Sequence, residues 1–200
     1  MPLTPAVNGP SGNRPKLVGV LALQGDFEAH AKLVRTIGAQ VREVRVPADL
    51  EGLDALIIPG GESTVMTLGI EREGLAEPLR ELVAAGIPVL GTCAGMIMLD
   101  RAHLGVLDID ARRNAFGRQV RSFEADIDLA GIEGGPMHAV FIRAPWVAEH
   151  GPAVEVLASV QDHPVAIRQG NVLAVSFHPE LSGDPRLHEL LLAAAVAGAD

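Results

Sequence analysis

The stretch IPVLGTCAGMIML, residues 87–99, carries the chain from an apolar run, through a turn of small residues, into a helical pattern. Residues 87–91 are predicted as a buried strand, and Cys93 follows directly in a Gly-x-Cys-x-Gly arrangement. In open α/β sheets, reactive groups gather beyond the carboxyl ends of the strands. The arrangement is therefore typical of a nucleophile elbow, in which a side chain projects from a sharp strand-to-helix turn, and a helix N-terminus favours the thiolate. The alternative is structural, because the same glycines would let a helix pack closely on a sheet.

Strands and helices alternate on the N-terminal side of this stretch. Apolar runs rich in β-branched residues predict the strands, and apolar residues recurring every three or four positions predict the helices. The predicted strands are residues 16–23, 41–46, 54–61 (running into a glycine turn) and 87–91, and the predicted helices follow Gly25 up to Gly38 and run from Leu75 to Gly86. Such alternation predicts a parallel sheet covered by helices on both faces.

Residues 104–177 follow a different pattern, in which short strands succeed one another with turns between them. The predicted strands are residues 119–127, 138–144, 154–160, 164–169 and 172–177. Consecutive short strands favour antiparallel pairing, so we predict them as additions to the same sheet. The expected fold class is α/β, with three layers and a mostly parallel central sheet flanked by helices. Residues 1–15, rich in proline and glycine, are predicted as a flexible tail, and residues 16–200 as a single domain.

The composition limits the partners and the compartment of the protein. The chain has 200 residues and a formal net charge of −9, which argues against nucleic acid or an anionic membrane surface as its main partner. Its one cysteine cannot form an internal disulfide, which fits a reducing compartment. The start lacks the apolar run of a signal peptide, and the longest apolar run, residues 190–199, is too short to span a bilayer. We therefore expect a cytoplasmic protein.

A thiolate nucleophile requires a base, and the base requires an orienting partner. The stretch AVSFHPEL, residues 174–181, offers both as His178 and Glu180. Because they lie two apart at the end of an apolar strand, their side chains are expected to leave the same face, and Pro179 favours an extended His178. A second candidate base, His163, is set aside because its acidic neighbour would point to the opposite face. The remaining histidines lack the spacing of metal ligands, so we expect no metal: His30, His103, His138, His150 and His188.

A second glycine turn lies in LIIPGGEST, residues 56–64. Ser63 or Thr64 can cap a short helix there. The N–H of Gly61 is expected to form an oxyanion hole together with the N–H of Ala94. A simple tight turn explains this segment alone equally well. Nucleotide binding is disfavoured because the Gly-Lys-Ser/Thr of a phosphate loop is absent.

Six stretches resemble, in the same order, the motifs of one enzyme family. They are LALQGDFEAH (21–30), PGGEST (59–64), GTCAGMI (91–97), RNAFGRQVRSFEADI (113–127), VFIRAP (140–145) and SFHPEL (176–181). The cysteine and His-Pro-Glu stretches resemble those of class I, or triad, glutamine amidotransferases. The fourth and fifth stretches narrow the resemblance to the glutaminase subunits of pyridoxal 5′-phosphate synthases. It extends over nearly all of residues 16–200 and implies a flavodoxin-like fold.

The resemblance implies a role for each matched residue. Cys93 would attack the side-chain amide of L-glutamine, His178 would act as base and then protonate the departing ammonia, and Glu180 would orient His178. The glutamine-binding positions of the family correspond here to Gly61, Glu62, Ser63, Arg113, Ile142 and Arg143. An arginine suits the α-carboxylate of the substrate, and an acidic side chain suits its α-ammonium group. The local excess of arginines also indicates a site or an interface: Arg112, Arg113, Arg118 and Arg121.

The resemblance also implies a second protein. Ammonia is mostly protonated in neutral water, so an amidotransferase delivers it under cover to another active site. The family implies a barrel-shaped synthase subunit that combines ammonia with ribose 5-phosphate and glyceraldehyde 3-phosphate, and no cofactor is expected on this chain. Three alternatives stay open: a glutaminase for another synthase, such as the one making imidazole glycerol phosphate; a cysteine hydrolase or peptidase; and a non-catalytic regulatory subunit.

Overall fold

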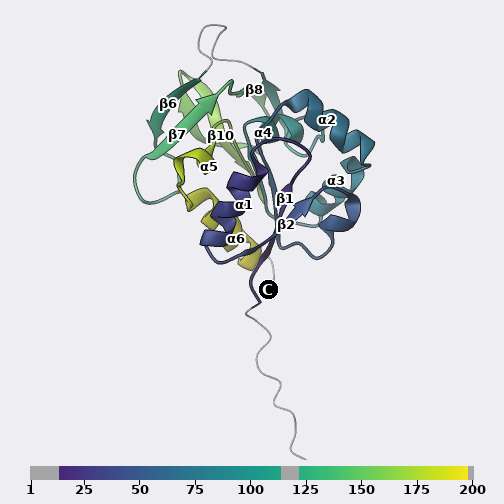
Figure 1. The fold of residues 1–200 in the computed structure, drawn as a ribbon. Coiled ribbons are helices and arrows are strands. Elements are labelled where there is room, and N and C mark those ends of the chain that lie inside the picture. Colours follow the sequence, from purple (N-terminus) through teal and green to yellow (C-terminus); the bar gives the residue numbers. More distant parts are fainter. Residues whose placement is uncertain (1–13, 114–121, 198–200) are drawn as a thin grey trace, which may run out of the picture.

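A seven-stranded sheet forms the centre of the structure, a computed structural model that describes residues 14–113 and 122–197 (Figure 1). The strand order is β2-β1-β3-β4-β11-β10-β9. The strands are β1 (Leu17–Leu21), β2 (Gln40–Val44), β3 (Ala55–Ile58), β4 (Val89–Thr92), β9 (Glu155–Val160), β10 (His163–Gln169) and β11 (Val172–Val175). The five strands from β2 to β11 are parallel, whereas β10 and β9 are antiparallel additions at one edge. Residues 1–13 of the predicted tail lie outside the described residues.

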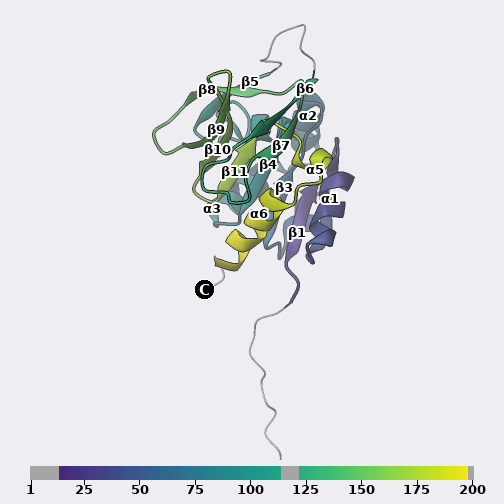
Figure 2. The ribbon, with the colours of Figure 1, turned by 90° about the vertical axis from the view of Figure 1, so that its left-hand side faces the viewer.

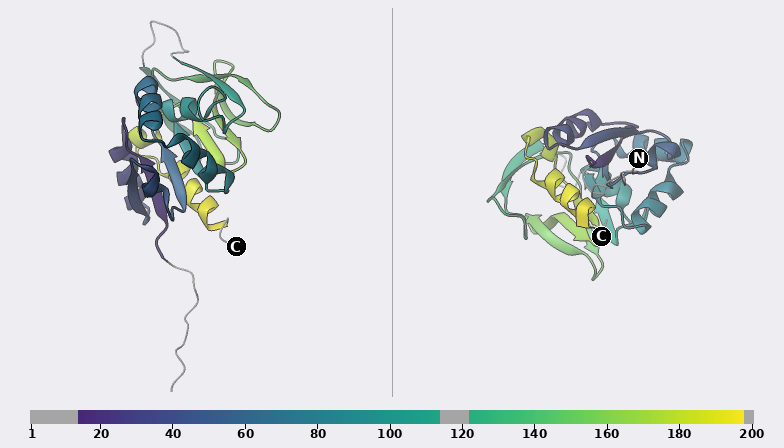
Figure 3. Two further views of the ribbon diagram at one scale, coloured as in Figure 1. Left: turned by 90° about the vertical axis from the view of Figure 1, so that its right-hand side faces the viewer. Right: turned by 90° about the horizontal axis from the view of Figure 1, so that it is seen from below.

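Helices and two small sheets cover both faces of the central sheet (Figures 2 and 3). One face carries α1 (Phe27–Thr36), α6 (Arg186–Ala197) and the pair β6 (Ser122–Ile127) and β7 (Met137–Ile142). The other carries α2 (Ser63–Arg72), α3 (Ala76–Ala84), α4 (Ala94–Leu99) and the pair β5 (Ile109–Arg112) and β8 (Trp146–His150). The shorter helices are η1 (Pro47–Leu50) and α5 (Pro179–Ser182). No helix within the described ranges combines the length and apolarity needed to cross a bilayer.

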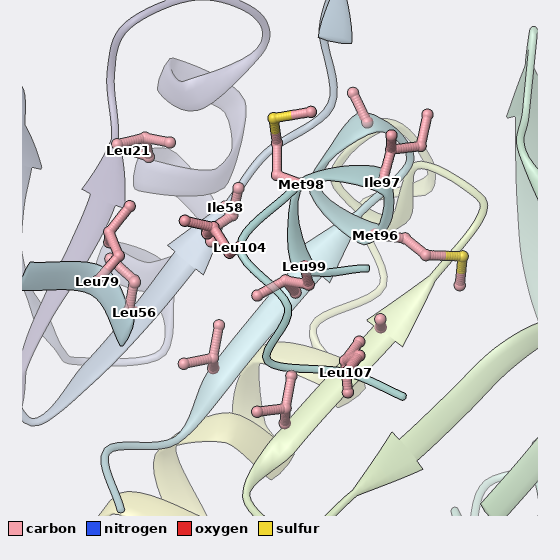
Figure 4. Packing of buried hydrophobic residues seen from close by; sticks show 14 of the residues in the cluster. Leu21, Leu56, Ile58, Leu79, Met96, Ile97, Met98, Leu99, Leu104 and Leu107 are labelled. Carbon is pink, nitrogen blue, oxygen red and sulfur yellow. The ribbon is translucent and has the colours of Figure 1, made fainter. Parts of the chain in front are cut away.

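The central strands divide their side chains between two buried cores. In β3, Ala55 and Ile57 join the core under α1 and α6, whereas Leu56 and Ile58 join the core under α2, α3 and α4. Figure 4 shows the second core, in which the side chains gather around the short helix α4. Because both faces are covered, the central strands are continuously apolar, and the predicted three-layer α/β class is confirmed.

The glycines of the first stretch let α4 lie directly on the sheet. A Cβ atom added to Gly95 would collide with the carbonyl oxygen of Ile58. A Cβ atom added to Gly91 would lie 2.6 Å from Cδ1 of Leu99 and 3.0 Å from the carbonyl carbon of Gly95. The structural explanation of these glycines therefore holds, and it does not exclude an elbow at the residue between them.

The prediction that residues 104–177 add antiparallel strands to the same sheet is confirmed for β9 and β10 and is wrong in two other respects. First, β11 pairs parallel with β4, in an inner position where its run VLAV is buried on both faces. An apolar run without alternation is the pattern of such a strand, and the antiparallel pairing of β11 is made on its other side, with β10. Second, β6 and β7 form a separate two-stranded sheet, as do β5 and β8, because their apolar side chains complete the two cores from outside.

The parallel strands end level with one another. The register pairs Ile58 of β3 with Gly91 of β4, and Thr92 of β4 with Val175 of β11. The loops that follow these strands therefore leave the same edge of the sheet, which is where ligands bind in open α/β folds.

Candidate active site

Cys93 occupies the turn between β4 and α4 in a strained conformation. Its φ of 49° and ψ of −108° lie in a region that residues with a side chain rarely adopt. The N–H of Cys93 donates to the carbonyl of Val175 at 2.8 Å, so β11 holds the turn in place. The Sγ atom lies 3.8 Å from the carbonyl oxygen of Ile142. Ala94 begins α4, so its N–H is among the first of that helix, which have no acceptor within the helix.

His178 and Glu180 belong to the short helix α5, not to the end of a strand. β11 ends at Val175, and His178 is the N-cap of α5 with Pro179 in the first helical position, where its missing N–H costs nothing. The prediction that the two side chains meet because they alternate along a strand is therefore wrong, since no strand is present there. They nevertheless meet, because Nδ1 of His178 lies 2.7 Å from Oε1 of Glu180. The N–H of His178 donates to Val140 of β7 at 2.9 Å and fixes the backbone there.

The other ring nitrogen of His178 is left for Cys93. Burial by itself would lower the pKa of His178, but the interaction with Cys93 and the hydrogen bond to Glu180 outweigh it and raise the pKa far above its usual value. Burial would raise the pKa of Glu180, but the hydrogen bond to His178 and the close approach of His30 outweigh it and hold the pKa well below its usual value. A carboxylate and an imidazolium are therefore the stable forms at neutral pH.

Gly60 lies close to both the candidate nucleophile and the candidate base. A Cβ atom at this position would lie 2.5 Å from Cε1 of His178 and 3.3 Å from Cβ of Cys93. The first distance is shorter than real Cβ atoms tolerate, so only glycine lets the turn after β3 lie against the imidazole. The neighbouring backbone is held by Gln24, whose Oε1 accepts from the N–H of Glu62 at 2.6 Å.

A cavity of about 370 Å³ opens over Cys93, within the size range of small-molecule sites. Its lining includes Cys93, Ala94, His178 and every residue at which the sequence predicts glutamine binding: Gly61, Glu62, Ser63, Arg113, Ile142 and Arg143. Glu180 lies behind the imidazole, away from the cavity. The structure thus brings all the predicted site residues to one place, from loops far apart in the chain.

The cavity carries a negative side chain at the start of α2. Glu62, and not Ser63 or Thr64 as predicted, is the N-cap, because its carboxylate accepts from the N–H groups of Thr64 at 3.1 Å and Val65 at 2.9 Å. These backbone hydrogen bonds lower the pKa of Glu62, so it is ionised at neutral pH. The helix that it caps has ten residues and is longer than the short helix predicted.

The cavity also carries a positive side chain, Arg113. Its Nη1 donates to Oγ1 of Thr64 at 3.1 Å, and its Nη2 lies 3.4 Å from Nε2 of His103. Nδ1 of His103 lies 2.7 Å from the buried carboxylate of Asp100, which places the ring proton there and leaves Nε2 free to accept. Of the four predicted arginines, Arg118 and Arg121 lie outside the described residues.

Several residues of the site carry no signal in the sequence. Asp26 and Ile97 line the cavity, and His30, Thr92 and His188 are buried behind Glu180. The stretch 21–30 contains Asp26 and His30, but its pattern assigns no role to either. Among the described residues, one group of three could hold a metal ion by distance, Asp26 with His178 and Glu180. The last two are already bonded to each other, which does not favour a metal.

Comparison with known proteins agrees with this geometry. The family model described as the SNO glutamine amidotransferase family matches residues 20–197. A protein of Frankia alni named pyridoxal 5′-phosphate synthase subunit PdxT is 54% identical over 184 residues, which cover 88% of this chain and 92% of the relative. The protein of the same name from Acidothermus cellulolyticus is 55% identical over 201 residues, covering 94% and 97%.

Two solved structures resemble this chain, one in sequence and fold and the other in fold alone. A structure described as a glutamine amidotransferase is 49% identical and superposes with a TM-score of 0.84, covering 90% of this chain and 98% of its own. PurLQS from Thermotoga maritima is 16% identical with a TM-score of 0.67, covering 94% and 100%. The second likeness shows the fold alone.

Proposed function

The chain belongs to the SNO glutamine amidotransferase family, and from this premise we propose that it is the glutaminase subunit of a pyridoxal 5′-phosphate synthase. In this role, residues 16–200 act as one domain that hydrolyses L-glutamine to L-glutamate and ammonia. The observation that carries the proposal is the cavity on which the candidate nucleophile, its base and all six expected glutamine-binding residues meet.

The first half of the reaction forms a thioester. The Cys93 thiolate attacks the side-chain amide carbon of glutamine, and the carbonyl electron pair moves onto the oxygen. We assign the N–H groups of Gly61 and Ala94 to this oxyanion. When the oxyanion collapses, the carbon–nitrogen bond breaks, and the nitrogen takes the proton that His178 holds on Nε2 and leaves as ammonia.

The second half regenerates the thiolate. Water attacks the thioester carbon while His178, now neutral, takes one of its protons. Collapse of the second oxyanion breaks the carbon–sulfur bond and releases glutamate. The proton stays on the imidazole facing the thiolate. Throughout, Glu180 holds Nδ1 of His178 and stabilises the imidazolium, as the third member of a triad does.

Two opposite charges in the cavity suit the amino-acid end of the substrate. We assign Arg113 to the α-carboxylate and Glu62 to the α-ammonium group. Both side chains are already anchored, by Thr64 and by the start of α2 respectively, so little side-chain freedom is lost when glutamine binds.

The ammonia requires an acceptor site on another protein. The relatives named above are subunits of pyridoxal 5′-phosphate synthase, which supports a partner subunit here. We propose that this partner is a barrel-shaped synthase that takes the ammonia directly and combines it with ribose 5-phosphate and glyceraldehyde 3-phosphate. We place the complex in the cytoplasm, a proposal that the single cysteine supports.

The test is release of glutamate from glutamine, measured for the chain alone, for the chain with a pyridoxal 5′-phosphate synthase partner subunit, and for Cys93→Ala with the same partner. We expect partner-stimulated release that is lost in Cys93→Ala. Release that persists in that variant would refute the nucleophile. Release that the partner does not stimulate, with no transfer of the amide nitrogen into pyridoxal phosphate, would refute the role as a synthase subunit.

A further inference from the structure

Glu180 is held from two sides, and only one of them belongs to the triad. Its Oε1 faces His178, whereas its Oε2 lies 3.1 Å from Nε2 of His30, which comes from α1. The side chains of Glu180 and His30 are completely buried. No well-aligned hydrogen bond from a described residue reaches Oε2, so the N–H of His30 is the donor at hand for this oxygen.

The chemistry of the neighbours fixes the protons in this cluster. A carboxylate only accepts, so Nε2 of His30 carries the proton, which it shares between Glu180 and Oγ1 of Thr92, also 3.1 Å away. In a neutral imidazole Nδ1 of His30 is then the acceptor, and we assign Nε2 of His188, 2.9 Å away, as its donor. This assignment leaves Nδ1 of His188 without a proton. It fits the finding that this buried nitrogen has no hydrogen-bond partner among the described residues.

We propose that His30 is a positioning residue of the glutaminase reaction, oriented by His188, and that it holds Glu180 in the rotamer that keeps Oε1 on His178. The chain of contacts runs from α6 through α1 to α5 and so to the imidazole beside Cys93. This inference rests on the proposed function. It extends the triad to two buried histidines that come from separate helices.

The other charged groups near the cluster are few. Asp26 precedes α1, and its carboxylate lies within 4.8 Å of ligand atoms of His178 and Glu180. Asp184 precedes α6 and acts on His188 through its charge. Neither carboxylate bonds to the His30 imidazole, so a substitution of the His30 side chain changes the contact to Glu180 first.

The experiment uses the rate at which iodoacetamide alkylates Cys93, the only cysteine of the chain, measured against pH by mass spectrometry. His30→Leu removes the donor to Glu180, whereas His30→Gln keeps a donor near the position of Nε2. We expect His30→Leu to move the pH midpoint of alkylation upward by about one unit and to slow alkylation at pH 7 about tenfold, because a displaced Glu180 no longer supports the imidazolium. His30→Gln should stay within about threefold of the wild type.

Three further measurements make the test decisive. His138→Leu, an exposed histidine on β7, is the matched control and should leave the profile unchanged. With glutamine and the partner, His30→Leu should lower kcat and leave KM unchanged. Nitrogen-15 NMR of the wild-type imidazoles should show the proton of His30 on Nε2, a result that needs no variant to fold.

A folded His30→Leu protein with the wild-type alkylation profile would overturn the proposal, and so would a bare Nε2 on His30. Alkylation and NMR need neither glutamine nor a partner. They therefore decide the role of His30 even if the wild-type protein releases no glutamate, which would refute only the proposed function.

Discussion

The imidazole of His178 separates two regions of opposite character. On the Cys93 side lies an open cavity with glycine turns, two anchored charges and room for a substrate. On the Glu180 side lies a closed cluster of buried polar groups that bond almost only to one another. The cavity must admit glutamine and water, so its residues stand on loops at the edge of the sheet. The cluster must exclude water, because a carboxylate holds an imidazolium most strongly in a dry environment.

The difference also lies in how the chain builds each region. The cavity side takes its key groups from the ends of β3, β4, β5 and β7, so each can be placed from a short stretch. The cluster takes one side chain each from α1, β4, α5 and α6. We therefore expect changes in the cluster to act through His178, and changes in the cavity to act on the substrate or on the space it needs.

The largest effect is expected from Glu180→Gln, which breaks the cluster at its centre. An amide cannot offer an acceptor oxygen to both histidines, so either His178 or His30 faces a second donor. We expect kcat for glutamate release to fall about 10³- to 10⁴-fold, as when a triad loses its carboxylate. Glu155→Gln, which removes an exposed partner of Arg168, should leave kcat unchanged. A loss below tenfold in Glu180→Gln would contradict the assigned role.

The same variant has a signature in stability. Because the folded protein lowers the pKa of Glu180, its stabilising contribution is complete above about pH 4.5 and is lost as the pH falls. At pH 7, Glu180→Gln should cost about 3 kcal/mol of unfolding free energy, since it breaks a buried ion pair. The difference between the two proteins should shrink below pH 4.5. Urea unfolding at several pH values measures it.

Gly60→Ala should give the next largest effect, because it pushes on the imidazole from the cavity side. The new Cβ would lie 2.5 Å from Cε1 of His178, so the ring must shift from its present position. A displacement of about 1 Å costs about 10²-fold in rate, and we expect a loss of that size in kcat. The control is Gly69→Ala in α2, where the new Cβ meets the Leu23 side chain, most closely its flexible end at 3.2 Å. Equal activity in the two variants would show that Gly60 does not set the position of His178.

The cavity on the Cys93 side could be predicted from the sequence more fully than the buried cluster on the Glu180 side. The elbow at Cys93 and the layered sheet were predictable, because a glycine-flanked turn after an apolar strand is a local pattern. The pairing of His178 with Glu180 was predicted for the wrong reason, since a helix and not a strand brings them together. His30 and His188 are 158 positions apart, and no spacing rule relates them. Only the packing of α1 against α5 and α6 places them together, and that packing is a property of the whole fold.

Arg113→Met tests the cavity for binding alone. If Arg113 holds the substrate carboxylate in both the ground state and the transition state, KM should rise about tenfold or more while kcat changes little. Arg112→Met is the matched control, because Arg112 is exposed and adjacent to Arg113 in the sequence but does not line the cavity. A fall in kcat at unchanged KM would instead place Arg113 in the chemical step.

His188→Gln should have the smallest effect on kcat, because His188 reaches His178 only through His30 and Glu180, and its clearest signature is the pH dependence of stability. Burial and the nearby His30 lower the pKa of His188 to about 3, so the folded protein keeps it neutral while the unfolded chain protonates it below about pH 6.5. Stability from this group is thus present above pH 6.5 and is lost, by about 1.4 kcal/mol per pH unit, as the pH falls toward 3. Glutamine cannot take up a proton, so urea unfolding of the variant should lack this slope between pH 6.5 and 5.

The control, His138→Gln, should change the slope of unfolding free energy against pH in the opposite direction, because Asp126 and Glu124 raise the pKa of that exposed histidine. If the unfolding free energies of the wild type and His188→Gln changed with pH at the same slope, His188 would be protonated in the folded state. Its Nδ1 would then carry a proton, which contradicts the proton assignment given above for this cluster.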